Sequence, residues 1–369
     1  MKEKKSNFSG SLGFVLAAAG SAVGVGNIWR FPYLCAKDGG GLFLLIYLVL
    51  VLTFGFVLLT TDIAIGRKTK QNALKAFGTV RPGWGFLGYL TFLVPTLIMT
   101  YYSVIGGWVI KYLVEYVKGN TQNLATDGYF SEFISNGAST EICFLVFALF
   151  TVGIIYAGVR NGVERVSKFM MPVLVFLSIV ITIYSVTRPG ALQGVKYFLI
   201  PNAKNFSWMT VVAAMGQMFY SLSIAMGILV TFGSYMKKDV AIESSTQNVE
   251  VFDTAIAIMA GLMIIPAVFA FSGGDPDTLQ AGPALMFITI PKVFASMGFG
   301  TFAGVMFFLL VLFAALTSSI ALTESAVSTF EDELGWSRKS STVLCGVIMI
   351  ALGSLSSLGY GPLANVKII

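Results

Sequence analysis

Apolar residues form nine long runs along the chain, separated by short polar connections. The runs lie near 11–36, 42–66, 86–117, 140–158, 168–187, 208–235, 252–272, 300–330 and 341–358. A helix that crosses a bilayer needs about 20 predominantly apolar residues. The pattern therefore predicts an all-α polytopic protein whose nine helices span a lipid bilayer.

The first run contains residues that an ordinary spanning helix avoids. Gly24 and Gly26 each disfavour a helix by roughly 1 kcal/mol relative to Ala. Asn27 and Arg30 follow, and a charged side chain near the bilayer centre costs about 2.5–3.5 kcal/mol. Non-helical backbone at membrane depth survives only where protein buries it or it lines a cavity. The stretch predicts a helix broken near 22–26, with freed carbonyls facing a polar pocket; a glycine-rich packing face is the alternative.

The sixth run repeats this signal, because Gln217, Ser221, Ser223 and Gly227 lie in its middle. Serines in apolar helices also bond back to the preceding turn, which is the alternative interpretation. Paired interrupted helices in two halves of a chain indicate the binding site of a transporter. Two five-helix units of opposite topology are expected, a first repeat over 1–207 and an incomplete second repeat over 208–369.

Two later runs carry oxygen-bearing side chains. Asp253 lies in the seventh run, and an intramembrane carboxylate is a functional candidate by default. The alternative places it in water at a helix end. Thr317, Ser318 and Ser319 lie in the eighth run, where they either pack against a neighbouring helix or supply the oxygen ligands that hard cations prefer.

The distribution of basic residues predicts an orientation. Lysines and arginines gather in the N-terminal segment and in the connections 67–81 and 159–168. Such segments stay in the cytoplasm, so we expect a multi-pass protein of the cell (inner) membrane with a cytoplasmic N-terminus. The polar break and the later spans favour an uncleaved first helix over a signal peptide. The connection 273–299 then lies outside, and its short apolar stretch 282–288 indicates a re-entrant or capping hairpin.

The composition excludes several classes of function. Charged residues make up 11% of the chain, and the net charge of +6 lies in short connections, which gives no indication of nucleic-acid binding. The absence of histidine excludes HExxH metal sites and Ser–His or Cys–His nucleophile pairs. The three cysteines are far apart and form no disulfide or metal pattern. An aspartyl pair of Asp62 and Asp253 is disfavoured because Asp62 lies near the cytoplasmic end of its helix. We therefore expect no enzyme and no catalytic residue.

Five motifs together identify a family. They are Ala22–Pro32 (AVGVGNIWRFP), Asp38–Gly41 (DGGG), Gly66-Arg67, Gln217 with Ser221–Ser223, and Leu316–Ser319 (LTSS). With them the chain resembles the neurotransmitter:sodium symporters over essentially its whole length, in particular the prokaryotic amino-acid members similar to the bacterial leucine transporter. The resemblance implies sodium-coupled symport of amino acids by alternating access on an inverted five-plus-five fold.

One departure from the family is large. The family core has ten helices, whereas nine are expected here, so the resemblance suggests a chain truncated after about nine helices. A transport-incompetent fragment is therefore one alternative. A channel-like membrane protein is another, although it would not explain a gate at Trp29 and Arg30 and would need a repeated pore ring.

The resemblance implies two Na⁺ sites. The first would use Ala22, Asn27, Ser221 and Asp253, with the substrate carboxylate completing it. The second would use Gly20, Val23, Ala314, Thr317 and Ser318.

The resemblance also implies a substrate pocket for a neutral hydrophobic or aromatic L-amino acid. Backbone amides near the first break and the Tyr102 hydroxyl would hold the carboxylate, and carbonyls of the sixth helix would hold the ammonium group. The lining contains no charge. Its expected residues are Ala22, Gly24, Gly26, Ile98, Tyr102, Phe219, Tyr220, Ser221, Ser223, Met226, Ser318 and Leu322.

The resemblance also implies two gates and bears on whether chloride is required. Arg30 and Tyr220 would form an outer gate, and Lys5, Tyr235 and Asp332 an inner one. Relatives that need chloride bind it with residues matching Tyr47, Gln217 and Ser221 and with a serine at the position of Ala257. Since Ala257 lacks the hydroxyl and Asp253 lies one turn away, we expect chloride independence. The sequence leaves the oligomeric state and the particular amino acid open.

Overall fold

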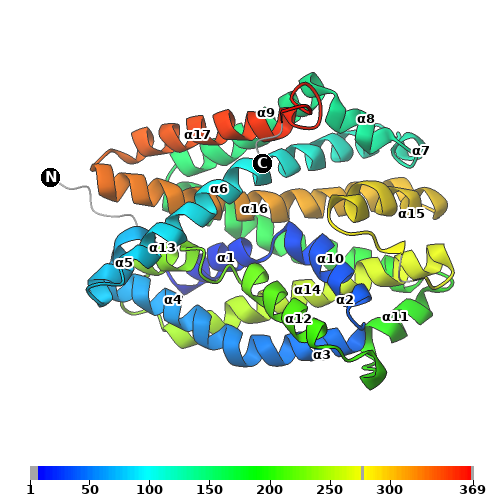
Figure 1. Ribbon diagram of the computed structural model, residues 1–369, viewed down its shortest axis with the longest axis horizontal. Coiled ribbons are helices and arrows are strands. Elements are labelled where there is room, and N and C mark those ends of the chain that lie inside the picture. The colour runs from blue at the N-terminus through cyan, green and yellow to red at the C-terminus, as the bar shows by residue number, and fades with distance from the viewer. Residues whose placement is uncertain (1–6, 276–277, 367–369) are drawn as a thin grey trace.

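The computed structural model describes residues 7–275 and 278–366, and their regular structure is helical. Figure 1 shows most of the long helices running roughly along the longest axis of the molecule. Within these ranges seven helices are long and apolar enough to cross a membrane, and a pair bent by 51° raises the number to eight. The expectation of an all-α polytopic membrane protein is confirmed.

The first predicted run is the bent pair. Helix α1 (Ser11–Ala22) ends at the predicted break, and the π-helical turn η1 (Gly26–Arg30) continues into α2 (Phe31–Lys37). Every residue of α1 from Gly13 to Ala22 is buried. The helix packs against α10, α14 and α16, so this stretch lies inside the bundle rather than facing lipid.

The sixth predicted run is also interrupted. Helix α12 (Trp208–Ser221) and helix α13 (Ile228–Ser234) are separated by the non-helical linker 222–227. Neither half is long enough to span a membrane by itself, which is why α12 and α13 are not among the eight. Both breaks that the polar residues predicted are therefore present, while the inverted relation between two repeats stays a prediction.

The remaining spans match the predicted runs, except that the fifth begins at Val159 and the seventh at Ile242, each well before the predicted start. The second begins with α3 (Gly41–Leu50), passes through η2 (Val51–Gly55) and ends with α4 (Phe56–Thr69). The fifth joins η3 (Val159–Glu164) to α10 (Arg165–Val186). The others are single helices, namely α6 (Phe86–Val117), α9 (Gly137–Tyr156), α14 (Ile242–Ser272), α16 (Gly300–Leu334) and α17 (Arg338–Leu358).

Shorter helices connect and cover the spans. They are α5 (Ala73–Val80), α7 (Thr121–Leu124), α8 (Tyr129–Ser135), α11 (Ala191–Leu199), η4 (Ala203–Asn205), η6 (Leu285–Thr289) and α15 (Ile290–Ser296). The last two form the apolar segment expected between the seventh and eighth runs. Helix α15 packs against α7, α14 and α16, so this segment covers one end of the bundle.

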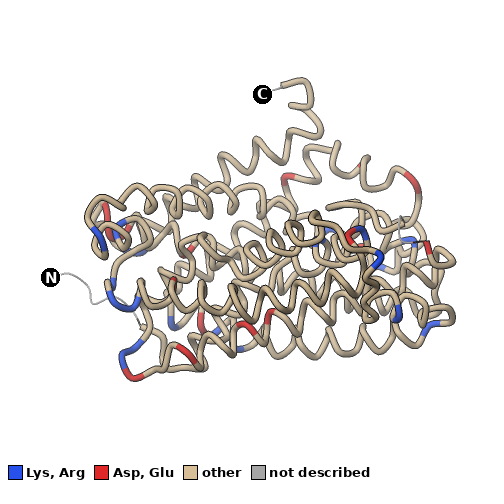
Figure 2. The backbone as a smooth tube through the Cα atoms, turned by 60° about the horizontal axis from the view of Figure 1, so that its bottom comes forward, with Lys and Arg blue, Asp and Glu red and all other residues tan. Residues whose placement is uncertain are grey.

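The outer surface is suited to lipid. Large apolar side chains such as Leu52, Phe150 and Trp208 are more than half exposed on the outer helices. Most Lys and Arg residues lie toward the two ends of the long axis (Figure 2). Apolar surface between two charged ends is typical of a protein that crosses a bilayer.

Candidate functional site

The break in the first helix frees backbone groups that then bond to side chains. Val23 is extended, so the helical ladder stops at Ala22. The Gly24 N–H donates to Asn27 Oδ1 at 3.1 Å, and the Val25 N–H donates to the Tyr102 hydroxyl at 3.1 Å. Two of the amides expected to meet a carboxylate thus lie beside the hydroxyl that was predicted to act with them.

A buried polar cluster joins this break to the second broken helix and to α14. Asn27 Nδ2 donates to Asp253 Oδ1 at 2.7 Å and to Ser221 Oγ at 3.0 Å. Ser221 Oγ lies 2.9 Å from both carboxylate oxygens of Asp253, and the Tyr47 hydroxyl lies 3.3 Å from Oδ2. The side chains predicted for the first sodium site therefore meet, and Ala22 lines the adjoining cavity.

The position of Asp253 excludes one alternative for this residue. Helix α14 begins at Ile242, so Asp253 lies well inside it, and its side chain has no exposed surface. It is not at a helix end in water. A buried carboxylate beside two hydroxyl oxygens is suited to a hard cation, because the negative charge is costly to bury without a compensating positive one.

A second cluster lies where α16 crosses the end of α1. Ser318 Oγ is 3.3 Å from the Gly20 carbonyl oxygen, 3.3 Å from that of Val23 and 3.4 Å from that of Ser21. A hydroxyl has one proton to donate, so the three carbonyls outnumber it as acceptors. This surplus of oxygen lone pairs is the chemical character of a cation site.

Thr317 lies next to this cluster but bonds differently. Its hydroxyl donates to the carbonyls of Phe313 at 2.9 Å and Ala314 at 3.2 Å in its own helix. A Cβ built on Gly20 would lie 3.1 Å from Thr317 Cβ, so the predicted residues of the second site are close neighbours. A hydroxyl that donates its proton keeps its oxygen lone pairs, so Thr317 Oγ1 can still serve as a cation ligand beside the Ala314 carbonyl.

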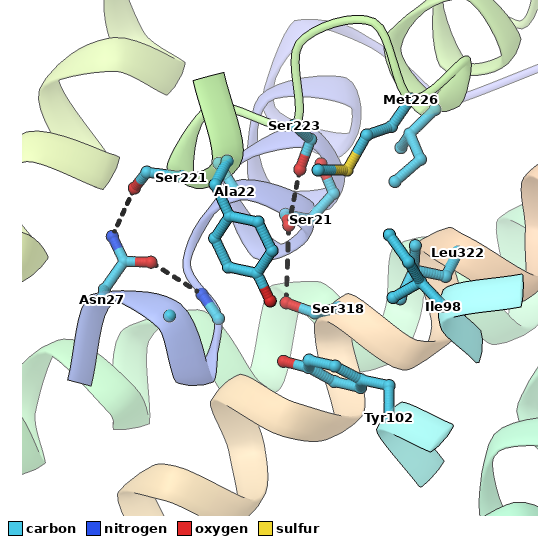
Figure 3. Close-up of a pocket in the computed structure, with 14 residues that line it drawn as sticks. Ser21, Ala22, Asn27, Ile98, Tyr102, Ser221, Ser223, Met226, Ser318 and Leu322 are labelled. Carbon is cyan, nitrogen blue, oxygen red and sulfur yellow. Dashed lines mark hydrogen bonds between the residues drawn. The ribbon is translucent and has the colours of Figure 1, made fainter. Parts of the chain in front are cut away.

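A cavity lies between the two breaks (Figure 3). None of the residues around it is charged, which agrees with the expected lining. They are Ser21, Ala22, Gly24, Gly26, Asn27, Ile98, Tyr102, Tyr220, Ser221, Ser223, Met226, Ile228, Ser318 and Leu322.

One residue expected in the lining lies outside the cavity, and two residues that line it were not expected. Phe219 does not line the cavity, and its side chain is 37% exposed. Successive helical residues project about 100° apart, so the rotation of α12 that turns Tyr220 inward turns Phe219 outward. Ser21 and Ile228 line the cavity but were not predicted. A small polar residue next to a break was the available signal for Ser21, whereas no pattern in the chain points to Ile228.

The pair predicted as the outer gate is in contact. The Arg30 guanidinium carbon lies 5.3 Å from the centroid of the Tyr220 ring, within the range of a cation–π interaction. Arg30 Nη1 also donates to Gln217 Oε1 at 2.9 Å. The Tyr220 ring in turn approaches the break closely, since a Cβ on Gly26 would lie 2.4 Å from Cε1 of that ring. Glycine at position 26 therefore makes room for the aromatic gate.

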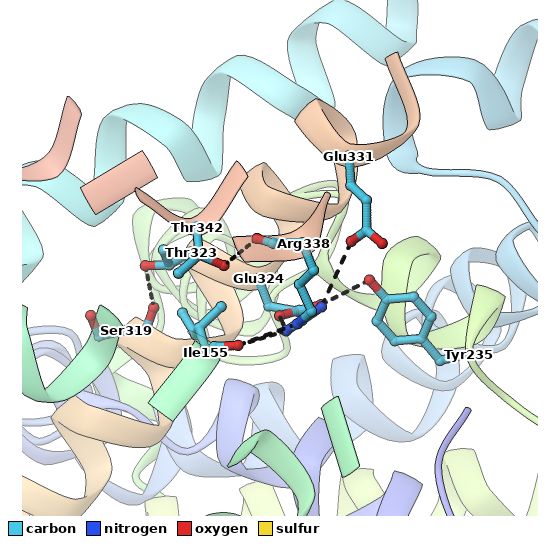
Figure 4. Close-up of polar contacts among 8 residues, drawn as sticks. All are labelled: Ile155, Tyr235, Ser319, Thr323, Glu324, Glu331, Arg338 and Thr342. Atoms are coloured by element: carbon cyan, nitrogen blue, oxygen red, sulfur yellow. Dashed lines mark hydrogen bonds and ion pairs between the residues drawn. The ribbon is translucent and has the colours of Figure 1, made fainter. Parts of the chain in front are cut away.

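Tyr235, one of the residues predicted for the inner gate, lies in a group of polar contacts with Glu324 and Arg338 (Figure 4). The Tyr235 hydroxyl donates to Glu324 Oε1 at 2.8 Å, and Arg338 binds both oxygens of that carboxylate at 3.0 and 2.5 Å. Asp332 Oδ2 accepts a bond of 3.2 Å from Asn72. Lys5 lies outside the described residues, so the inner gate stays a prediction.

Glu324 was missed at this end of the molecule. Its side chain is fully buried, and its position inside the eighth apolar run was a usable signal.

Comparison with known proteins places these features in a family. The model described as "Sodium:neurotransmitter symporter family" matches residues 5–132 and 130–366. The sodium-dependent transporter YhdH of Bacillus subtilis is 35% identical over 372 residues, which cover 100% of this chain and 82% of that protein. The sodium- and chloride-dependent GABA transporter 2 of Mus musculus is 27% identical, over 89% of this chain and 62% of its own.

A solved structure is also similar. The crystal structure of MhsT in complex with L-phenylalanine has a TM-score of 0.89 and 38% sequence identity to this chain. The match covers 99% of this chain and 83% of MhsT.

Proposed function

The chain belongs to the sodium:neurotransmitter symporter family, and on this premise we propose that it carries neutral hydrophobic or aromatic L-amino acids with Na⁺ by alternating access. The observation that carries the proposal is the uncharged cavity between two broken helices, bordered by two oxygen-rich clusters. As a transporter of this family the protein is not an enzyme.

The two ends of the cavity suit the two charged groups of an amino acid. The carboxylate would accept from the amides near Gly24–Gly26 and from the Tyr102 hydroxyl, which already bonds to the Val25 N–H. A helix N-terminus favours an anion at this place. Carbonyls at the end of α12 and in the linker 222–227 would accept from the ammonium group.

The side chain of the substrate would lie against an apolar wall. Ile98, Met226 and Leu322 lie at one side of the cavity (Figure 3). No lining residue could pair with an ionic side chain, so charged amino acids would lose their hydration without compensation. The L-phenylalanine bound by the structurally similar MhsT supports this substrate class.

Sodium would bind as a second cargo at both clusters. The first cluster would use Asn27, Ser221, Asp253 and the Ala22 carbonyl, together with the substrate carboxylate. That shared carboxylate would make substrate affinity depend on Na⁺. The second cluster would use Ser318 and Thr317 with carbonyls of Gly20, Val23 and Ala314.

Chloride independence is the finer part of the proposal. Asp253 supplies a buried negative charge beside the first cluster, and Ala257 has no hydroxyl to bind an anion. Two anions one helical turn apart would repel strongly in this interior. The GABA transporter named above is both sodium- and chloride-dependent. Under this proposal the family contains chloride-dependent and chloride-independent transporters.

We further place the protein in the cell (inner) membrane with its N-terminus in the cytoplasm, because the basic connections fall on that side. A transport-incompetent fragment forms no part of the proposal.

The test is a binding screen of the twenty amino acids on the purified chain, by thermal shift in Na⁺ and in K⁺ buffers. Stabilisation by neutral apolar L-amino acids in Na⁺ alone is the expected result, and equal affinity in K⁺ would refute it. Counterflow of the labelled ligand into proteoliposomes then separates a carrier from a channel, since only a carrier exchanges substrate in this way.

A further inference from the structure

An apolar groove lies on a different part of the molecule, between α6, α9, α10 and α16. Its volume is about 430 Å³, and ten of its eleven lining residues are apolar. None of them lines the cavity between the broken helices. Phe150 and Phe169 are 61% and 66% exposed, so the groove opens on the outer surface of the helices.

The exception among the lining residues is Arg165, the first residue of α10. Its side chain is exposed, and within residues 7–275 and 278–366 no hydrogen bond or ion pair of its guanidinium is present. The neighbouring carboxylate of Glu164 is already engaged, because it accepts from the Ser9 N–H at 2.8 Å and from Lys168 at 2.5 Å. Arg165 thus presents a charge at one end of an apolar groove.

This combination selects an amphipathic anion. An acyl chain would contact the aromatic wall, where Phe169 and Phe313 lie with their ring centroids 6.3 Å apart. A guanidinium presents a planar fork that binds phosphate oxygens in pairs. A free phosphate ion would make no apolar contacts with the aromatic side chains, and a neutral hydrocarbon would not pair with the charge of Arg165.

We infer that the groove binds an anionic phospholipid, with one acyl chain along Phe147, Phe150 and Phe169 and the headgroup phosphate on Arg165. The location agrees with this occupant. Arg165 lies in the second turn of the span that begins at Val159, and a long basic side chain near a span's end extends to the level of the lipid headgroups. Basic pockets between such helices bind anionic headgroups. The inference stands apart from the proposed function, because none of the residues that line the groove is a proposed ligand in either cluster.

The test is native mass spectrometry of the purified full chain with added phosphatidylglycerol or phosphatidylcholine of identical acyl chains. We expect preferential retention of phosphatidylglycerol. Arg165→Gln should lower that retention about fivefold and leave phosphatidylcholine unchanged, since one basic residue near a headgroup is worth about that factor. Arg165→Lys keeps the charge but lacks the planar guanidinium. Its retention of phosphatidylglycerol should lie between that of the unmodified chain and that of Arg165→Gln.

Two matched variants test the wall. Phe169→Ala should lower the retention of both lipids, whereas Phe176→Ala, which is 61% exposed on the same helix but does not line the groove, should not. Arg160→Gln is the matched control for Arg165, because Arg160 is exposed nearby and outside the groove. Because the side chains of Phe169 and Arg165 are exposed, their substitution should leave the folded state intact. A thermal unfolding scan of each variant checks this.

Three outcomes would overturn the inference. One is equal retention of phosphatidylglycerol by Arg165→Gln and the unmodified chain. Another is binding of inorganic phosphate at Arg165 with no preference for lipid. The third is a protein dimer that is lost in Phe169→Ala, which would show that a second copy of the chain covers the groove.

Discussion

Asn27 Nδ2 lies 2.7 Å from Asp253 Oδ1, and this bond ties the interrupted first helix to the middle of the uninterrupted helix α14. Ser221 of the other interrupted helix bonds to the same carboxylate. With the Tyr47 hydroxyl of α3, one negative charge thus joins four separate segments. Anything that neutralises Asp253 or removes it changes the contacts of both breaks at once.

The first prediction concerns that charge. Asp253→Asn should lower the affinity for Na⁺ by about tenfold or more, because a nearby negative charge attracts a buried cation by several kcal/mol even at an effective dielectric constant of about 20. A sodium titration of ligand binding measures the change. Thr254→Val on the same helix is the control and should leave the titration unaltered.

A second prediction concerns the anion. Replacement of chloride by gluconate should leave sodium-dependent binding of the unmodified chain intact. In Asp253→Asn, the added Ala257→Ser should partly restore binding in chloride and not in gluconate, since the serine hydroxyl would help to hold a mobile anion. A strong chloride requirement in the unmodified chain would contradict the role given to Asp253.

The hydroxyls of α16 give a third prediction. Thr317→Ala combined with Ser318→Ala should weaken Na⁺ binding by roughly ten- to a hundredfold, because polar partners left unsatisfied in a buried site cost about 1–3 kcal/mol. Thr323→Ala is the matched control, since among the described residues its hydroxyl bonds only to the Ser319 carbonyl of its own helix, at 2.8 Å. If the double variant titrates like the control, the two hydroxyls serve packing alone.

Gly26 gives a fourth prediction. Gly26→Ala places a methyl group against the Tyr220 ring, which must move and lose its position under Arg30. Substrate affinity should fall, as measured by equilibrium binding. Gly153→Ala in α9 meets nothing within 4 Å and should be neutral or stabilise the helix by up to about 1 kcal/mol. Equal binding by both variants would show that the gate tolerates displacement of the ring.

The fifth prediction concerns stability. Arg338→Met leaves the buried carboxylate of Glu324 without its cation and should destabilise the fold by about 3–5 kcal/mol in denaturant titration. Adding Glu324→Gln should recover part of this loss, because the uncompensated charge is then gone. Lys75→Gln, which removes a half-exposed partner of Glu333, should cost less than about 1 kcal/mol.

The sequence predicted the breaks well because their cause is local. Glycine, asparagine and arginine inside an apolar run conflict with a continuous spanning helix wherever they occur, and the helix stops at Ala22 as expected. The start of α14 was missed by about ten residues. Residues 242–251 are largely polar, and hydropathy finds the apolar part of a helix rather than its polar extension.

Other features depend on packing that one sequence does not reveal. Phe219 and Tyr220 are both large and aromatic, and only the rotation of α12 against its neighbours decides which of them faces the cavity. The pairing of Tyr235 with Glu324 depends on α13 meeting α16 across a separation of 89 residues. Such contacts follow from the arrangement of the whole bundle.

The linker between α12 and α13 limits which residues can line its side of the cavity in related sequences. Ser223 and Ala225 have φ angles of 54° and 60°, a left-handed conformation that β-branched residues strongly disfavour. Ser223 lines the cavity, so enlargement from that side with Val, Ile or Thr would strain the backbone. Ile98 and Leu322 lie on continuous helices with no such restriction. New ligand preferences should therefore arise by substitution on α6 and α16, while the linker varies little.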